Sequence, residues 1–293
     1  MTFDPNKGLL IPTQAEIANA LATMRVSSIN AGDVPGWEDN LKEYSESLIK
    51  SLAVELQQQN DCNANSGATG EEGRRFFCTG EMTQLSRTYG YNACEYVSGA
   101  GNVGRDQGTS IQSMVEVLVN GIKSLGVAPG LPLEADYKYM TYERSASRFA
   151  ERAKGVQIDK TFVAQHGPAP SLEDLPLHCA LGGTVHFGVY WGVRFETRVI
   201  GGRKFKTWVT TSGGGGGHAL EIVTCLWLDG QWCPAGWNSH GDGLFIMLPE
   251  IYTKYQKTQF APFGGYGLMP DKPVERYYDC RLSGGGLFPK NYA

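Results

Sequence analysis

The order of two hydrophobic periodicities along the chain most limits the folds open to it. Up to Ala153 the apolar residues recur at helical spacing in separate stretches, whereas from Leu181 they alternate in segments rich in β-branched and aromatic residues. Helices first and strands later, without βαβ alternation, predict an α+β fold with an antiparallel sheet. The 293 residues suffice for one large domain with extensions.

The helical periodicity predicts helices over residues 14–24, 44–59, 85–97, 110–125 and 142–153. Ser45 or Ser47 is expected to cap the second of these, and Gly126 to end the fourth. Segment 60–80 is polar and punctuated by glycines, which predicts a loop.

Three segments are expected to form strands. Residues 182–202 alternate and predict one long strand or a hairpin. Residues 218–233 predict two strands around an Asp-Gly turn. Residues 241–255 predict a strand followed by a short helix.

Charge and hydropathy exclude several classes of partner. The formal net charge is −4 and there is no basic block, so nucleic acid is not expected as a partner. No stretch reaches the apolar length of a membrane span, and the N-terminal sequence lacks a basic-then-apolar signal pattern. We therefore expect no membrane contact and no signal peptide, and a protein that is cytoplasmic or part of a larger particle.

The cysteines indicate thiols rather than a metal centre. There are seven, an odd number, and no pair has CxxC spacing, which favours reduced thiols over a zinc ribbon or a thioredoxin-type site. Cys225, Cys233 and His240 could be imagined as metal ligands, but their spacing favours thiols on neighbouring strands. We expect no metal and no cofactor.

Five glycines, residues 213–217, immediately precede His218 at the start of an apolar strand. A hairpin needs one or two glycines, so the run indicates a backbone that must stay slim or mobile beside a site. Asn238 follows near the end of a neighbouring strand. An amide–imidazole hydrogen bond between the two side chains would fix the ring's orientation and tautomer, as a base in nucleophilic catalysis requires.

These segments resemble motifs of the papain-like cysteine peptidases. GGHALEIV is similar to that family's histidine motif and WNSHGDGLFIM to its asparagine motif, with His240 in place of a tryptophan that shields the pair and Trp237 as a partial substitute. Residues 85–97, 104–139 and 172–191 resemble the family's middle regions in the same order. The resemblance covers residues 36–253 and implies a helical part with a central helix, a β-barrel-like part, and a substrate cleft between them.

In that family a cysteine begins the central helix, with an oxyanion-hole glutamine six residues earlier. The helix expected over residues 44–59 contains no cysteine, and its apolar pattern places Ser47 at the nucleophile position, with Ser45 as the alternative. Leu41 stands at the glutamine position, and the adjacent Asn40 is the remaining candidate for the oxyanion donor.

Cys62 and Cys78 are expected to lie off any helix N-terminus. Cys62 falls in the expected loop, and Cys78 precedes the next helix by several residues. They are interpreted as free thiols or as a disulfide pair.

Two hypotheses follow. A serine hydroxyl needs a stronger base and a better oxyanion hole than a thiolate does. The preferred hypothesis is therefore a papain-like domain at 37–255, catalytically impaired or inactive, that serves a structural or binding role in a larger assembly such as a virus particle. Its extensions, 1–36 and 256–293, would contact protein partners. Ser47 would then only cap its helix, and His218 and Asn238 would only tie two strands together.

The alternative is an active peptidase or amidase that uses Ser47, or a cysteine not yet placed, together with His218 and Asn238. The retained histidine–asparagine pair favours this second hypothesis.

Overall fold

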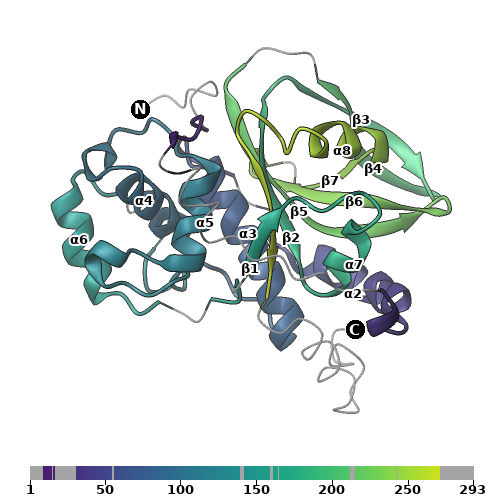
Figure 1. Cartoon of the computed structure of the whole chain (residues 1–293), viewed down its shortest axis with the longest axis horizontal. Coiled ribbons are helices and arrows are strands. Elements are labelled where there is room, and N and C mark those ends of the chain that lie inside the picture. Colours follow the sequence, from purple (N-terminus) through teal and green to yellow (C-terminus); the bar gives the residue numbers. More distant parts are fainter. Residues whose placement is uncertain are drawn as a thin grey trace.

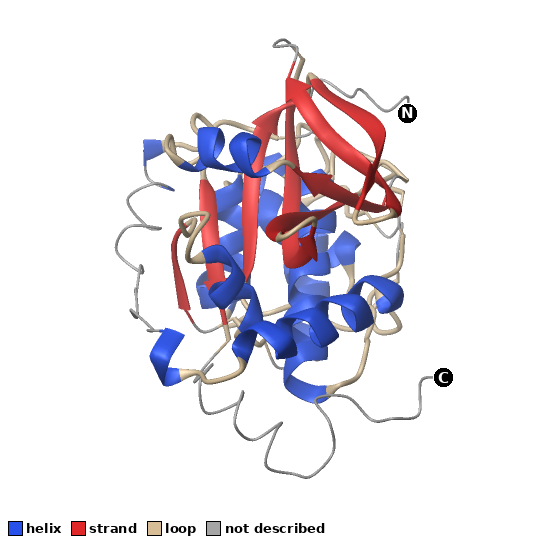
Figure 2. Cartoon of the chain, turned by 90° about the vertical axis from the view of Figure 1, so that its right-hand side faces the viewer, coloured by secondary structure: helices blue, strands red, loops and turns tan. Residues whose placement is uncertain are grey.

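The computed structural model describes residues 9–14, 16, 31–54, 56–138, 142–158, 161–163, 165–211, 215–241 and 243–270. Two parts lie side by side, one of helices and one built on a sheet, and helix α3 runs between them (Figure 1). Figure 2 views the molecule from the side of the sheet. The expected helix over 14–24 lies almost wholly outside the described residues.

The α-helices are α2 (Trp37–Ser51), α3 (Cys62–Thr79), α4 (Arg87–Val97), α5 (Ile111–Asn120), α6 (Ala146–Gly155), α7 (Leu175–Ala180) and α8 (Pro249–Gln256). Short 3-10 helices are η1 (Ala31–Asp33), η2 (Ala100–Asn102) and η3 (Lys123–Leu125). The helices expected over 85–97, 110–125 and 142–153 are confirmed as α4, as α5 with η3, and as α6. Gly126 ends η3 with a φ of 68°.

The helix boundaries expected between residues 44 and 80 are wrong. Helix α2 begins at Trp37, so Ser45 and Ser47 lie in its interior, and it ends at Ser51. The expected loop is instead helix α3, whose side chains are almost all buried. Its glycines allow close packing: a Cβ at Gly67 would lie 2.5 Å from Met114, and one at Gly70 would collide with the Glu221 carboxylate.

The strands form one eight-stranded sheet in the order β1-β8-β2-β5-β6-β7-β4-β3. All neighbouring pairs are antiparallel except β4 with β7. The strands are β1 (Gln165–Pro168), β2 (Thr184–Tyr190), β3 (Val193–Ile200), β4 (Arg203–Thr211), β5 (Gly217–Leu228), β6 (Gln231–Asn238), β7 (Gly243–Met247) and β8 (Gly265–Met269).

The strand predictions for residues 218–233 and 241–255 hold, and the one for residues 182–202 does not. Strands β5 and β6 around Asp229–Gly230, and β7 followed by α8, are confirmed. Residues 182–202 form neither one strand nor a hairpin, because β2 pairs with β5 and β8 whereas β3 pairs with β4. Strand β8 belongs to the segment that the sequence assigns to a C-terminal extension, yet it lies inside the sheet.

Two apolar cores hold these parts together. One lies among α3, α4, α5 and α6 and includes Tyr89, Leu118 and Phe149. The other lies under the sheet and includes Phe187 and Trp208. Among the described residues, no helix is long and apolar enough to span a membrane.

Candidate functional site

Cys62 is the first residue of α3 and is fully buried. Its Sγ accepts a hydrogen bond from the backbone N–H of Ala219, at 3.4 Å, at the start of β5. The expectation that Cys62 lies in a loop is therefore wrong, because its segment is helical. Cys78 lies near the other end of α3, about 24 Å away at 1.5 Å per residue. Both are free thiols, so a disulfide between them is excluded.

His218 and Asn238 lie at the beginning of β5 and the end of β6. The hydrogen bond expected between them is present, with 3.0 Å from Nε2 of His218 to Oδ1 of Asn238. Among the described residues, Nδ1 of His218 has no hydrogen-bond partner. The ring is thus held by one nitrogen, and the other can exchange a proton with a neighbouring group.

Two rings cover the histidine. The ring centroids of Trp191 and His240 each lie 4.2 Å from that of His218. Trp237, which the sequence offers as the shield, is engaged elsewhere, because its indole N–H donates to the Ala53 carbonyl at 3.0 Å. His240 packs against His218, and the indole ring of Trp191 lies where the resemblance implies a shielding tryptophan.

Burial sets the protonation states at the site. It lowers the pKa of His218 to about 3, helped by the nearby His240 and opposed by the Asn238 hydrogen bond. It raises the pKa of Cys62 to about 12, opposed by the Ala219 N–H and reinforced by the adjacent Asp61. At neutral pH the closed site therefore holds a neutral thiol and a neutral imidazole, because neither charged form is solvated.

Asp61 immediately precedes the thiol and is itself fully buried. Burial raises its pKa to about 7, although the Tyr142 hydroxyl donates to its Oδ2 at 2.6 Å and opposes the shift. Tyr142 also lines a polar pocket of about 580 Å³ beside α6. Tyr142 therefore joins the pocket to Asp61, and neither Cys62 nor His218 lines the pocket.

Gln57 is a further candidate for the site that the motifs of the sequence do not indicate. It is buried five residues before Cys62, its backbone N–H donates to the Ser239 carbonyl at 2.8 Å, and its Oε1 accepts from the Ser239 hydroxyl at 2.6 Å. Its side chain therefore lies beside the residue that follows Asn238. A search for a glutamine shortly upstream of each cysteine would have indicated both Gln57 and Cys62.

Ser47 and Asn40 lie on α2, outside this constellation. The Ser47 carbonyl accepts from the Ser51 hydroxyl at 2.9 Å, and Asn40 lies half-buried in the first turn. The neighbouring Ser45 contacts Thr224 at 2.6 Å, six residues along β5 from His218 and about 20 Å away at 3.4 Å per residue. The structure thus brings Cys62, and not Ser47, to the start of β5.

Residues 9 and 10 pass across the start of β5. Leu9 bridges Thr109 in a parallel and Gly217 in an antiparallel sense, and the Leu10 N–H donates to the Thr109 carbonyl at 2.9 Å. Leu9 is only 5% exposed, and a Cβ on Gly217 would lie 2.7 Å from its carbonyl oxygen. The glycine before His218 is needed because another backbone approaches it closely.

No protein-family model matches the sequence, and no curated protein matches it either. Solved structures do resemble the fold. The proform of the ragweed pollen cysteine protease Amb a 11 is 16% identical, with 91% of this chain and 74% of that chain covered and a TM-score of 0.51. ProCathepsin B S9 from Trypanosoma congolense is 13% identical, with 92% and 87% covered and a TM-score of 0.55. A recombinant stem bromelain precursor is 13% identical, with 85% and 75% covered and a TM-score of 0.51. The chain therefore has a papain-like fold.

Proposed function

We propose that the protein is a papain-like cysteine peptidase with Cys62 as nucleophile, His218 as base and Asn238 as the residue that orients the imidazole. The observation that carries this proposal is the position of Cys62, which opens a long buried helix with its sulfur against Ala219, the residue after His218. A helix N-terminus favours a thiolate, and its N–H groups can stabilise an oxyanion. Gln57 is the candidate side-chain donor to that oxyanion.

The reaction would proceed by acyl transfer. His218 takes the thiol proton, the thiolate adds to the peptide carbonyl, and the imidazolium returns the proton to the leaving amine. Water then attacks the thioester with His218 again as base, which releases the acid and restores the thiol. The hydrogen bond to Asn238 leaves Nδ1 as the nitrogen for these transfers.

With residues 9 and 10 over the site, the peptidase would be latent. Leu9 and Leu10 cover the start of β5, and Cys62 and His218 are 0% and 2% exposed. The three structures compared above are themselves described as a proform, a procathepsin and a precursor. Removal of the N-terminal segment would hydrate the site, which lowers the thiol pKa and raises the imidazole pKa toward an ion pair.

A peptide-library hydrolysis assay on full-length variants tests this proposal. Leu9→Asp places a carboxylate in an apolar site and should release the segment, so turnover should rise at least about tenfold over the unchanged chain. Cys62→Ser in the same background should abolish that turnover, whereas Ser47→Ala should leave it unchanged. Turnover that survives Cys62→Ser but not Ser47→Ala would assign the nucleophile to Ser47 instead.

The second candidate is a structural or binding role without catalysis. It is favoured by the filled site, in which thiol and imidazole are both buried and neutral. Partners held by residues 1–36 and 256–293 belong to this candidate. Absence of turnover in Leu9→Asp, with Cys62 there freely alkylated by iodoacetamide, would support it, because an open site would then lack activity.

A further inference from the structure

A second polar cluster lies directly beneath the candidate site, between α3 and the sheet. We call Asn63, Ser66, His186 and Glu221 the His186 cluster. Nδ1 of His186 lies 2.8 Å from Oε2 of Glu221, Nε2 lies 2.8 Å from Oδ1 of Asn63, and the Ser66 hydroxyl lies 3.2 Å from Nδ1. His186 and Glu221 are cross-strand neighbours on β2 and β5, and both are fully buried.

The hydrogen bonds determine which atoms carry protons. The Asn63 Nδ2 donates to the Ser110 carbonyl, at 2.6 Å, which can only accept. Its Oδ1 therefore faces His186, and Nε2 of that ring must be a donor. Nδ1 lies 2.8 Å from the Glu221 carboxylate, so both ring nitrogens have polar partners.

The surrounding charges balance. The other carboxylate oxygen of Glu221 accepts from the Thr184 hydroxyl at 2.5 Å. Arg74 donates to the same threonine and is paired with Glu71 at 2.9 Å. Arg74 also lies 3.9 Å from Glu221 (Nη1 to Oε1), so its guanidinium compensates both buried carboxylates.

Asn63 connects this cluster to the site wall. It directly follows Cys62, and besides the Ser110 carbonyl its Nδ2 reaches the Thr109 hydroxyl at 3.0 Å. Thr109 is the residue whose carbonyl accepts from Leu10, and Ser110 caps α5. One amide thus holds the backbone that pairs with an extended segment in the site.

We propose that Asn63 is a positioning residue: held by a hydrogen-bond donor at position 186, it fixes the Thr109–Ser110 wall relative to Cys62 and so sets how tightly the site holds an extended peptide. The proposal rests on the function proposed above where the peptide is a substrate. It stands independently where the peptide is the chain's own residues 9 and 10. No atom of His186 is assigned a role in bond making or breaking.

The geometry predicts which property changes. If Nε2 of His186 carried no hydrogen, its lone pair would face the Asn63 oxygen. The Asn63 amide would then rotate away from the wall. The sulfur would keep its place, because Cys62 is held by helix α3 and by Ala219. Peptide binding should therefore weaken while the reactivity of the thiol toward a small reagent is retained.

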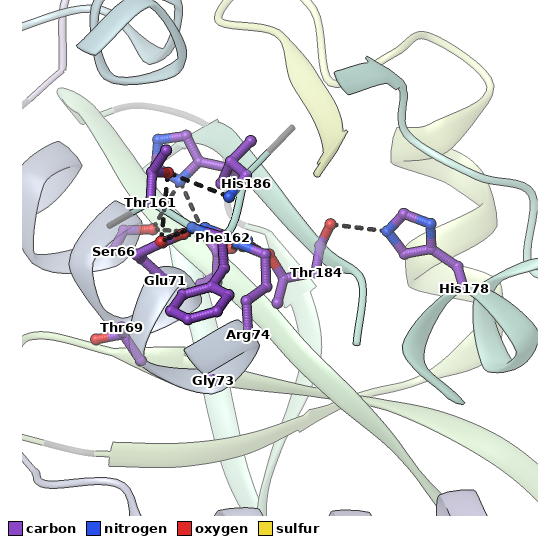
Figure 3. Close-up of polar contacts among 12 residues, drawn as sticks. Ser66, Thr69, Glu71, Gly73, Arg74, Thr161, Phe162, His178, Thr184 and His186 are labelled. Carbon is purple, nitrogen blue, oxygen red and sulfur yellow. Dashed lines mark hydrogen bonds and ion pairs between the residues drawn. The ribbon is translucent and has the colours of Figure 1, made fainter. Parts of the chain in front are cut away.

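Two variants separate these effects. Asn63→Leu removes the link to the wall. The pair His186→Gln with Glu221→Gln keeps a neutral cluster and an amide N–H that can reach Asn63. His178→Gln is the control, since His178 is a half-buried histidine whose Nε2 contacts the Thr184 carbonyl, at 3.0 Å, without a hydrogen bond to Asn63 (Figure 3).

In the Leu9→Asp background, Asn63→Leu should raise KM for peptides about tenfold, as expected for lost buried hydrogen bonds, with little change in kcat. The double glutamine variant and His178→Gln should leave KM within about threefold. Iodoacetamide alkylation of Cys62 should be equal in all of these variants. A fall in kcat and in alkylation together would overturn the proposal, because it would show general disorder of the site.

A readout without peptidase activity uses the chain with Leu9 in place. Asn63→Leu should loosen residues 9 and 10 and raise the rate of Cys62 alkylation about tenfold, whereas the double glutamine variant should not. If Leu9→Asp shows no hydrolysis, the proposed function fails but this comparison still decides the role of the wall. An unchanged alkylation rate in Asn63→Leu would refute the positioning role.

Discussion

Two buried histidines on neighbouring strands make opposite use of their surroundings. His218 on β5 meets a neutral amide oxygen through Nε2, and aromatic rings cover its face. His186 on β2 meets an amide oxygen through one nitrogen and a carboxylate through the other. Both side chains are almost completely inaccessible. Burial therefore does not distinguish the two histidines, whereas the charge of their polar partners does.

The largest effect should be on peptide hydrolysis, when His218 and His186 are replaced in separate variants. In the Leu9→Asp background, His218→Ala should lower kcat/KM for peptide hydrolysis at least about 10³-fold, because it removes the general base. The paired glutamine replacement of His186 and Glu221 should leave kcat within about threefold. Steady-state kinetics on the two variants measures the contrast. Comparable losses in both would mean that the distinction between the two histidines is wrong.

In the next prediction, which concerns the free energy of unfolding, the larger effect belongs to His186. His186→Leu removes the nearest partner of Oε2 of the buried Glu221 carboxylate, which keeps Thr184 and Arg74 at its other oxygen, and should lower the free energy of unfolding by about 3 kcal/mol. His218→Leu leaves only the Asn238 oxygen short of a partner, and that oxygen still accepts from the His240 N–H at 3.3 Å, so about 1–2 kcal/mol is expected. Urea unfolding at pH 7 measures both, and similar losses would argue against a buried ion pair at His186.

The same contrast explains what the sequence could and could not predict. His218 and Asn238 could be predicted as neighbours because they lie on two strands joined by an Asp-Gly turn, so their proximity follows from local pairing. The Asp-Gly turn sets the register that brings their ends together. Motif order along the chain correctly indicated the papain-like fold as well.

Helix α3 was missed because its helical character does not come from its own sequence. Segment CNANSGATGEEGRRFFCT has three interior glycines and few apolar residues at helical spacing. Its stability comes from burial on nearly every side, with small residues against the sheet and with Glu72 paired to Arg87 at 3.0 Å. The expectation of a loop over residues 60–80 kept Cys62 from being considered at a helix N-terminus and left Ser47 as the candidate there. The glycines at 67, 70 and 73 share one helical face, which was the available signal.

The smallest effect concerns acid stability. The pKa of His218 is lowered to about 3 in the folded protein and is near 6.5 in the unfolded chain, so its contribution is complete above pH 6.5 and is lost as the pH falls toward 3. Asp61, with a pKa raised to about 7, has the opposite sign: its contribution is complete below pH 4 and is lost as the pH rises toward 7. The two slopes offset each other between pH 4 and 6.5.

Substitution should uncover each slope separately. In His218→Gln, the free energy of unfolding should be about 2 kcal/mol higher at pH 5 than at pH 6.5, whereas in the unchanged chain these two groups should leave it nearly equal at the two pH values. Asp61→Asn should do the reverse, because it leaves the histidine slope unopposed. Urea unfolding at the two pH values measures both differences. An unchanged slope in His218→Gln would contradict the lowered pKa of His218, and an unchanged slope in Asp61→Asn would contradict the raised pKa of Asp61.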